Sequence, residues 1–141
     1  MSKTIEYTSE SSYRLSRGHE GDAGIDLIAN ENVTIPSGRS VAIHTGISFK
    51  IPDGMYGKIE SRSGLAVGHG IHHIAGVIDS GYRGEIIVGL ENRGRGSYDV
   101  LKGDRIAQII FQKYEALEPV CVETISAKTE RGEAGFGSTG Y

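Results

Sequence analysis

The 141-residue chain lacks the features that mark secreted, membrane-spanning and nucleic-acid-binding proteins. It has one cysteine, Cys121, so an internal disulfide is excluded and a reducing compartment is expected. No apolar run approaches the roughly twenty residues of a membrane span, and residues 1–6 lack the apolar stretch of a signal peptide. The net charge of −3, with both signs mixed, offers no basic face for nucleic acid. We therefore expect no membrane or nucleic-acid partner. The expected location is cytoplasmic, or nuclear or in the host cytoplasm for a eukaryotic or viral source.

Tryptophan is absent and proline occurs three times, whereas glycine occurs 21 times, about twice its average share. Many glycines, many β-branched residues and no long helical pattern are typical of short strands joined by tight turns. Alternation predicts strands at residues 41–45, 56–60, 85–92 and 105–111. Only residues 62–67 could form a helical turn. We predict an all-β sandwich or jelly roll, in which a symmetric oligomer is one way to cover the exposed sheet edges.

The composition changes after Ile125, so we expect a domain at residues 1–125 and a glycine-rich C-terminal arm at residues 126–141. Within the domain, valines flank Cys121 on both sides. This pattern predicts a buried cysteine on a strand and argues against a catalytic thiol.

The arm combines residue types that suit a nucleotide polyphosphate. Arg131 supplies a planar fork that matches phosphate oxygens, and Phe136 lies between glycines, where its ring is free to lie flat on a base. Glycine lets backbone N–H groups converge on an anion, and Gly137 is followed by the hydroxyls of Ser138 and Thr139. The alternative is a frayed tail, since termini are disordered unless they are tied down. No Walker A pattern is present.

Two other segments place polar groups where phosphate or metal chemistry could use them. Asp26 lies inside an apolar strand, where aspartate is disfavoured unless something pairs with it. It is either a metal-water ligand or an anchor for other side chains, or else an aspartate of a turn. Arg62, Ser63 and Gly64 can present a guanidinium, a hydroxyl and a free N–H to one phosphate, and a helix start would add N–H groups. A serine-capped turn is the plain alternative.

Residues 76–85 predict a hairpin with a carboxylate at its mouth. Asp79 ends an apolar strand, and Tyr82 follows three residues later. Such a carboxylate could act as a general base on water, and the tyrosine ring could pack on a sugar face. The alternative is an ordinary hairpin with Asp-Ser-Gly as its turn residues.

The histidines at positions 69, 72 and 73 have spacings that would suit zinc on a helix face. The segment contains Gly70, however, and is typical of a turn into a strand, which would separate His72 from His73. No Cys, Asp or Glu ligand adjoins them, so we do not expect a metal site here.

Taken together and in this order, these segments resemble the five motifs of the trimeric dUTPase family. The matching segments are residues 23–27, 57–66, 76–85, 103–108 and 131–140. The resemblance implies a homotrimer of jelly-roll subunits whose sites combine residues of more than one chain, with the arm crossing to a neighbour. It also implies Mg²⁺-dependent hydrolysis of dUTP to dUMP and pyrophosphate, which keeps uracil out of DNA and supplies dUMP for thymidylate synthesis.

The resemblance implies roles for the residues around the nucleoside. Asp79 would orient and deprotonate the water that attacks the α-phosphorus. Tyr82 would lie against the deoxyribose and leave no room for a 2′-hydroxyl. Main-chain groups of residues 76–82 would pair with the uracil edge, so that cytosine would leave buried groups unpaired. The other substrate-binding residues of this part are Gly76, Val77, Ile78 and Ile87.

It also implies roles around the phosphates. Arg62, Ser63 and Gly64 would hold them with support from Gln108, and Asp26 would reach Mg²⁺ through water. In the arm, Phe136 would stack on uracil beside Gly137. The γ-phosphate would be held by Arg131, Ser138 and Thr139.

Four positions depart from the commonest family pattern. Ala134 stands where the arm usually has glycine, so the chain there must avoid strongly positive φ. Glu60 and Ser61 stand where small residues and proline are frequent. His73 stands where relatives carry asparagine or a small apolar residue, which leaves a role for its side chain open.

Two other functions remain possible from the sequence. A dCTP deaminase of the same superfamily would carry its catalytic glutamate in a different local sequence; Gly64 and the complete arm favour the hydrolase, and Glu60 is only a faint hint to the contrary. A non-catalytic binding protein on the same fold would usually have lost the aspartate or the arm, whereas this chain keeps both.

Overall fold

The computed structural model describes residues 3–137, which form an antiparallel β structure with one short helix. The elements in chain order are β1 (Glu6–Ser9), β2 (Ile25–Ile28), β3 (Val33–Ile35), β4 (Ser40–His44), β5 (Ile47–Lys50), β6 (Met55–Glu60), α1 (Ser63–His69), β7 (Ile71–Ile74), β8 (Val77–Ile78), β9 (Ile87–Asn92), β10 (Tyr98–Val100) and β11 (Arg105–Lys113). The predicted all-β, jelly-roll class is confirmed. No helix in this described part is long and apolar enough to cross a membrane.

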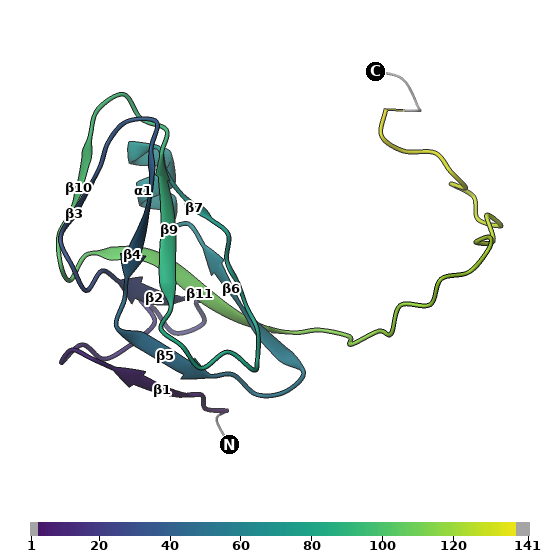
Figure 1. The fold of residues 1–141 in the computed structure, drawn as a ribbon, viewed down its shortest axis with the longest axis horizontal. Coiled ribbons are helices and arrows are strands. Elements are labelled where there is room, and N and C mark those ends of the chain that lie inside the picture. Colours follow the sequence, from purple (N-terminus) through teal and green to yellow (C-terminus); the bar gives the residue numbers. More distant parts are fainter. Residues whose placement is uncertain (1–2, 138–141) are drawn as a thin grey trace.

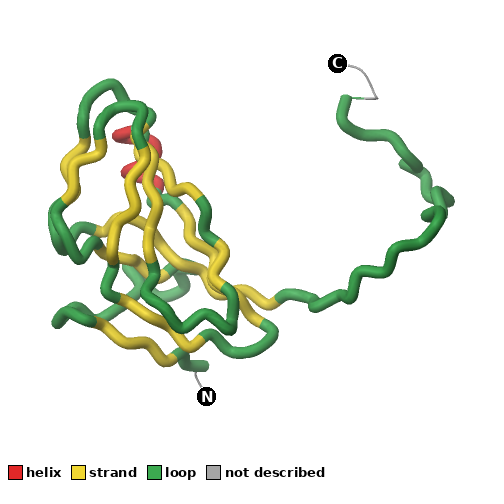
Figure 2. Tube along the Cα trace, in the orientation of Figure 1, coloured by secondary structure: helices red, strands yellow, loops and turns green. Residues whose placement is uncertain are grey.

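The strands form two main sheets and two strand pairs, all antiparallel. The larger sheet has the order β2-β11-β6-β8 and the smaller one β4-β9-β7, while β1 pairs with β5 and β10 pairs with β3. Figure 1 shows the strands of the smaller sheet crossing those of the larger one, with β1 and β5 along one end. The chain beyond β11 leaves this body as one long loop (Figure 2).

The core between the sheets is built from isoleucine, leucine and valine. Strand β9 shows how the pattern works, because Val88, Leu90 and Asn92 are buried while the residues between them are not. Phe49 adds an edge-on contact with Phe111, with ring centroids 5.2 Å apart. Burying one such apolar side chain is worth about 1.5–3 kcal/mol, so these short strands are stabilised mainly by their inner faces.

The local predictions agree with the structure to within about two residues. Strands expected at 41–45, 56–60 and 105–111 are β4, β6 and β11. The expected helical turn is α1, which Gly70 ends in the left-handed conformation. The strand expected at 85–92 begins only at Ile87, because the two preceding residues bond to the β4–β5 turn instead.

The hairpin predicted for residues 76–85 is wrong in its pairing. Strand β9 pairs with β7 and β4, whereas β8 pairs with β6. Gly76 causes the change of partner: its φ of 144° suits glycine, and a Cβ there would lie 3.0 Å from the Ile59 carbonyl oxygen. Its own carbonyl accepts a hydrogen bond from the Ile59 N–H at 2.8 Å. Residues 75–86 therefore connect β7 to β9, and the short strand β8 within this connection is held against β6. We call the whole connection loop 75–86.

The prediction of a buried strand cysteine is also wrong. Cys121 is exposed and lies beyond β11, in a stretch that forms no strand within the described residues. Its neighbours Val120 and Val122 are 76% and 57% exposed. Alternating apolar residues favour a strand only where a second strand offers backbone hydrogen bonds, and this segment has left the sheets.

Candidate active site

One hollow of about 490 Å³ gathers the residues predicted to bind phosphate and metal. Strand β11 lies between β2 and β6, and Gln108 stands opposite Asp26 on one side and Glu60 on the other. The segment after β6 adds the remaining predicted groups. The predicted residues that line the hollow are Asp26, Arg62, Ser63, Gly64 and Gln108.

Asp26 is part of a strand and is paired with two cations, so it is not a turn aspartate. Its side chain is 18% exposed, its Oδ1 lies 3.4 Å from Nε of Arg62, and its Oδ2 lies 3.9 Å from Nε of Arg105. Each guanidinium group keeps free N–H donors beside Asp26 that suit an anionic ligand, although Asp22 also lines the hollow. Sequence reasoning missed Arg105, although it lies in a segment already singled out at residues 103–108.

Gln108 is fixed between the strands by close packing and one hydrogen bond. Its Nε2 donates to the Ser61 carbonyl at 3.0 Å. Gly24 makes room for it, since a Cβ at that position would come within 2.1 Å of the Gln108 Oε1. Position 24, in the first of the five motifs, must therefore be glycine so that the side-chain amide of Gln108 can reach the Ser61 carbonyl, next to Arg62.

The three unusual positions next to this segment contact one another. A hydrogen bond of 2.7 Å joins Ser61 Oγ to His73 Nδ1, and the His73 N–H donates to the same oxygen at 2.9 Å. Glu60 lies 3.9 Å from His73 Nε2 and 2.7 Å from Lys58 Nζ. The hydrogen bond from Lys58 lowers the pKa of Glu60 against an opposing effect of desolvation. These contacts tie the start of the phosphate segment to β7.

The three histidines whose spacing was considered for zinc, at positions 69, 72 and 73, point in different directions. His72 and His73 are adjacent in β7, so their side chains leave opposite faces of the strand. The ring of His69 packs against Tyr98, with centroids 5.2 Å apart. Residues 70–73 do form a turn into a strand, as predicted.

A second hollow, of about 220 Å³, holds the residues predicted to contact the nucleoside except Gly76, which does not line it. Asp79 follows β8 directly and is exposed at its rim. The Tyr82 N–H donates to the Asp79 carbonyl at 3.1 Å, and the Tyr82 hydroxyl donates to the Glu85 carbonyl at 2.7 Å. The lining residues are Val77, Ile78, Asp79, Tyr82, Glu85 and Ile87.

The arm lies away from both hollows (Figure 1). Arg131 Nε donates to the Ala134 carbonyl at 2.7 Å, and the Ala134 N–H donates to the Arg131 carbonyl at 3.1 Å. Ala134 has no positive φ, as expected for a residue in place of glycine. Phe136 is fully exposed and Gly137 has a φ of 84°. Ser138 and Thr139 lie outside the described residues.

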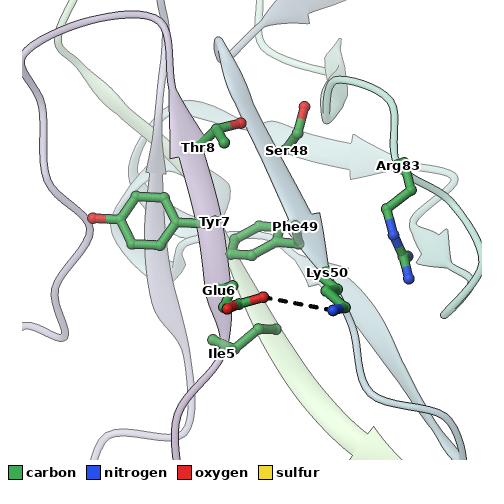
Figure 3. A pocket seen from close by; sticks show the side chains of 8 residues that line it. All are labelled: Ile5, Glu6, Tyr7, Thr8, Ser48, Phe49, Lys50 and Arg83. Carbon is green, nitrogen blue, oxygen red and sulfur yellow. Dashed lines mark ion pairs between the residues drawn. The ribbon is translucent and has the colours of Figure 1, made fainter.

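A larger hollow of about 660 Å³ contains none of the predicted site residues. It runs along β1 and β5, where Glu6 and Lys50 form an ion pair at 3.8 Å, and Arg83 lines its far side (Figure 3). Apart from Gly76, the predicted residues that the structure describes therefore fall into three separate groups in one chain: the phosphate hollow, the nucleoside hollow and the arm. The two hollows share no lining residue.

A jelly roll that carries an arginine-rich hollow and a small aromatic hollow with a carboxylate has the parts of a nucleotide-hydrolysing protein. Comparison with known proteins makes this specific, since the family model for dUTPase matches residues 11–140. The chain belongs to the dUTPase family.

Relatives from distant sources share most of the chain. A deoxyuridine 5'-triphosphate nucleotidohydrolase of Paramecium bursaria Chlorella virus 1 is 46% identical over 131 residues, covering 93% of this chain and 92% of the relative. One from Mycobacterium marinum is 46% identical over 132 residues, covering 89% and 86%. The Staphylococcus bacteriophage 80alpha dUTPase, solved with dUPNHPP, superposes with a TM-score of 0.91 at 28% identity. That match covers 99% of this chain and 100% of the phage chain.

Proposed function

We propose that this chain is a dUTP diphosphatase, which hydrolyses dUTP to dUMP and pyrophosphate. Such an activity keeps uracil out of DNA and supplies dUMP for thymidylate synthesis. The observation that carries the proposal is the grouping of Asp79 with Tyr82 in one hollow and of Arg62 with Gln108 in another, on a chain of this family.

Asp79 acts as the general base. Its carboxylate takes a proton from a water molecule, whose oxygen forms a bond to the α-phosphorus while the bond to the bridging oxygen breaks. Pyrophosphate leaves and dUMP remains. The exposed position of Asp79, directly after β8, supports this role because an incoming nucleotide and its water can reach it.

The nucleoside is selected by shape and by main-chain groups. Loop 75–86 offers its backbone at residues 76–82 to the uracil edge, and Val77, Ile78 and Ile87 form apolar walls. Tyr82 lies against the deoxyribose, with its hydroxyl already held by the Glu85 carbonyl. A cytosine would leave buried donors and acceptors unpaired, which costs about 1–3 kcal/mol for each group.

Mg²⁺ is the proposed cofactor, and Asp26 fits it as an oxygen ligand acting through water. The ion would neutralise phosphate charge during the attack. Within the phosphate hollow Asp26 stands beside Arg62 and Arg105, and Asp22 lines the same hollow, so both aspartates and both arginines would face a triphosphate and its metal ion. Arg62, Ser63 and Gly64 hold the phosphates, and Gln108 keeps that segment in place.

We propose that the enzyme is a homotrimer in which the nucleoside hollow of one chain meets the phosphate hollow of another. The stretch after β11 supports an assembly, because it exposes large apolar side chains that a lone chain leaves in water. These are Leu117, Val120, Val122 and Ile125. In this arrangement residues 1–125 form the jelly-roll domain, and the arm of residues 126–141 crosses to a neighbour. There Phe136 and Gly137 cover the uracil, while Arg131, Ser138 and Thr139 hold the γ-phosphate.

Pyrophosphate release should be compared for dUTP, dCTP, TTP and UTP, with Mg²⁺ and again after chelation with EDTA. We expect rapid release from dUTP alone and a large loss after chelation. A folded oligomer that releases no pyrophosphate from dUTP contradicts the proposal. Formation of a uridine nucleotide from dCTP would instead identify a deaminase, against which the engagement of Glu60 by Lys58 already argues.

A further inference from the structure

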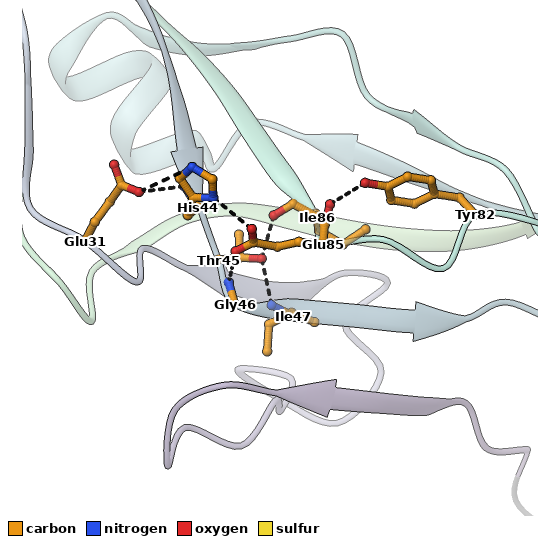
Figure 4. Close-up of polar contacts among 8 residues, drawn as sticks. All are labelled: Glu31, His44, Thr45, Gly46, Ile47, Tyr82, Glu85 and Ile86. Carbon is orange, nitrogen blue, oxygen red and sulfur yellow. Dashed lines mark hydrogen bonds and ion pairs between the residues drawn. The ribbon is translucent and has the colours of Figure 1, made fainter.

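Loop 75–86 carries Asp79 and Tyr82. Its C-terminal end is attached by hydrogen bonds to the turn between β4 and β5. The Ile86 N–H donates to the Ile47 carbonyl at 2.7 Å. The buried hydroxyl of Thr45 donates to the Ile86 carbonyl at 2.7 Å and accepts from the Ile47 N–H at 3.1 Å. Figure 4 shows the Thr45 contacts beside Glu85, with the Tyr82 hydroxyl reaching the same group from the other side. The position of the tyrosine therefore depends on residues about forty positions earlier in the chain.

Glu85 adds the charged part of this attachment. Its Oε2 accepts from the Gly46 N–H at 2.7 Å, and its Oε1 accepts from His44 Nδ1 at 2.8 Å. Its own carbonyl accepts the hydrogen bond of the Tyr82 hydroxyl at 2.7 Å. One residue thus joins the histidine at the end of β4 to the ring that lines the nucleoside hollow (Figure 4).

His44 faces carboxylates from three parts of the chain. Glu85 lies at hydrogen-bond distance, Glu31 lies 3.9 Å from its Nε2, and Glu10 acts from farther away. The hydrogen bond and charge of Glu85, followed by the charges of Glu31 and Glu10, raise the pKa of His44 above its ordinary 6.5, although desolvation opposes them. For Glu85, burial alone would raise the pKa, but the hydrogen bonds from His44 and Gly46 outweigh it and the pKa is lowered.

We propose that His44 and Glu85 are a positioning pair that holds loop 75–86 in its nucleotide-binding conformation, and that this hold is strongest while His44 is protonated. The inference rests on the proposed dUTP hydrolysis and adds a pH-dependent control of substrate affinity. His44 lines neither hollow itself, but it contacts two residues that line the nucleoside hollow: Glu85 through the hydrogen bond and Ile87 as its partner in the β4–β9 pair. The proposed effect on Tyr82 passes through Glu85, whose carbonyl accepts from the Tyr82 hydroxyl.

The direction of the pH effect follows from the two shifts. A histidine with a raised pKa contributes stability that is complete below its ordinary value and is lost as the pH rises through the raised value. A glutamate with a lowered pKa contributes stability above its ordinary value and loses it as the pH falls through the lowered one. The pair is intact in the interval between them, so the substrate affinity should fall on the alkaline side.

The test measures kcat and KM for dUTP from pH 5.5 to 8.5 in the native enzyme, His44→Gln and His44→Lys. In the native enzyme KM should rise about threefold as the pH increases and His44 loses its proton, a size expected for a partly exposed ion pair. In His44→Gln this change in KM should be absent. His44→Lys keeps its charge throughout and should hold KM low at alkaline pH. The matched control is His72→Gln on β7, which should keep the native profile.

Nuclear magnetic resonance of the His44 ring tests the same coupling without turnover. If protonation favours binding, then saturation with the non-hydrolysable analogue dUpNHpp must raise the pKa of His44 by linkage. Identical KM profiles in the native enzyme and His44→Gln, or a His44 titration unmoved by dUpNHpp, would overturn the positioning role while leaving dUTP hydrolysis intact. A native enzyme with no activity on dUTP but a His44 titration that dUpNHpp shifts would instead remove the proposed reaction and keep the pair.

Discussion

Asp26 shows how one residue can serve both the sheet and the site. Its carboxylate on β2 is mostly buried and so loses most of its hydration. The charges of Arg62 and Arg105 compensate for that loss. Asp22 also lines the hollow, so its two arginines are matched there by two aspartates. The same contacts hold Arg62 at the start of the segment proposed to bind phosphate, so an aspartate that is disfavoured in a strand positions a residue of the proposed site.

The role of Asp79 can be tested with a nearly isosteric change. Asp79→Asn removes the proton acceptor and leaves the shape of the loop, so kcat should fall about 10²–10⁴-fold, the usual contribution of a general base. The affinity for dUpNHpp, measured by calorimetry, should change little. Asp53→Asn, in the turn after β5, is the control and should keep native turnover. Native turnover in Asp79→Asn would remove the residue from the mechanism.

Residues whose role is local could be predicted from the sequence, and residues whose role depends on distant partners could not. Arg62, Asp79 and Tyr82 stand out because each lies in a short segment of complementary chemistry. Thr45 carries no such signal, because its partner Ile86 is 41 positions away. Asn92 ends a predicted strand, but nothing local shows that its side chain is buried and donates to the Ile35 carbonyl on another strand.

At the scale of elements, the β4–β5 turn is the point on which loop 75–86 rests. Thr45→Val removes the hydroxyl and leaves the Ile86 carbonyl and the Ile47 N–H each short of one partner. We expect a loss of about 1–3 kcal/mol in the free energy of unfolding, measured by urea denaturation. Thr45→Ser keeps the hydroxyl and should retain more of the stability than the valine variant. Equal stability of the two variants would show that the hydroxyl contacts contribute little.

Alternation located the strands but did not assign their partners. Gly76 turns β8 toward β6, and that choice depends on the fit of its backbone against Ile59, which no local pattern reveals. The stretch around Cys121 shows the opposite case, in which a strand-like pattern has no partner among the described residues of its own chain. Pairing is decided by the surfaces available, so the sequence predicts that a segment is suited to a strand and not that it forms one.

For the whole molecule, the arm is the part whose proposed function depends most on other chains. Deletion of residues 126–141 removes the proposed base-stacking ring and the γ-phosphate contacts. Stacking is worth about 1–3 kcal/mol and a charged hydrogen bond about 1.5–3 kcal/mol, so kcat/KM should fall about 10²–10⁴-fold.

Light scattering should show that the truncated protein keeps the native oligomeric state, because residues 114–125 remain. Removal of Tyr141 alone is the control and should leave kcat/KM near the native value. A truncated protein with full activity would mean that the arm is a frayed tail.

The fold class and the family could be predicted because both depend on features spread over the chain: glycine-rich turns, alternation and five segments in a fixed order. The assembly could be predicted only through the family. Nothing in the local chemistry of Arg62 or Asp79 indicates that their hollows stay apart within one subunit.

An arm that lies away from the hollows of its own chain has a consequence for mixed assemblies. If the arm closes a neighbour's site as proposed, a subunit with a damaged arm and an intact body would still enter assemblies with normal subunits, and the site that its arm should have closed would be inactive. The normal subunits could not replace the missing part, because each of them has only one arm. The activity of a mixed population would therefore fall in proportion to the share of damaged arms, even though every assembly keeps its full number of subunits.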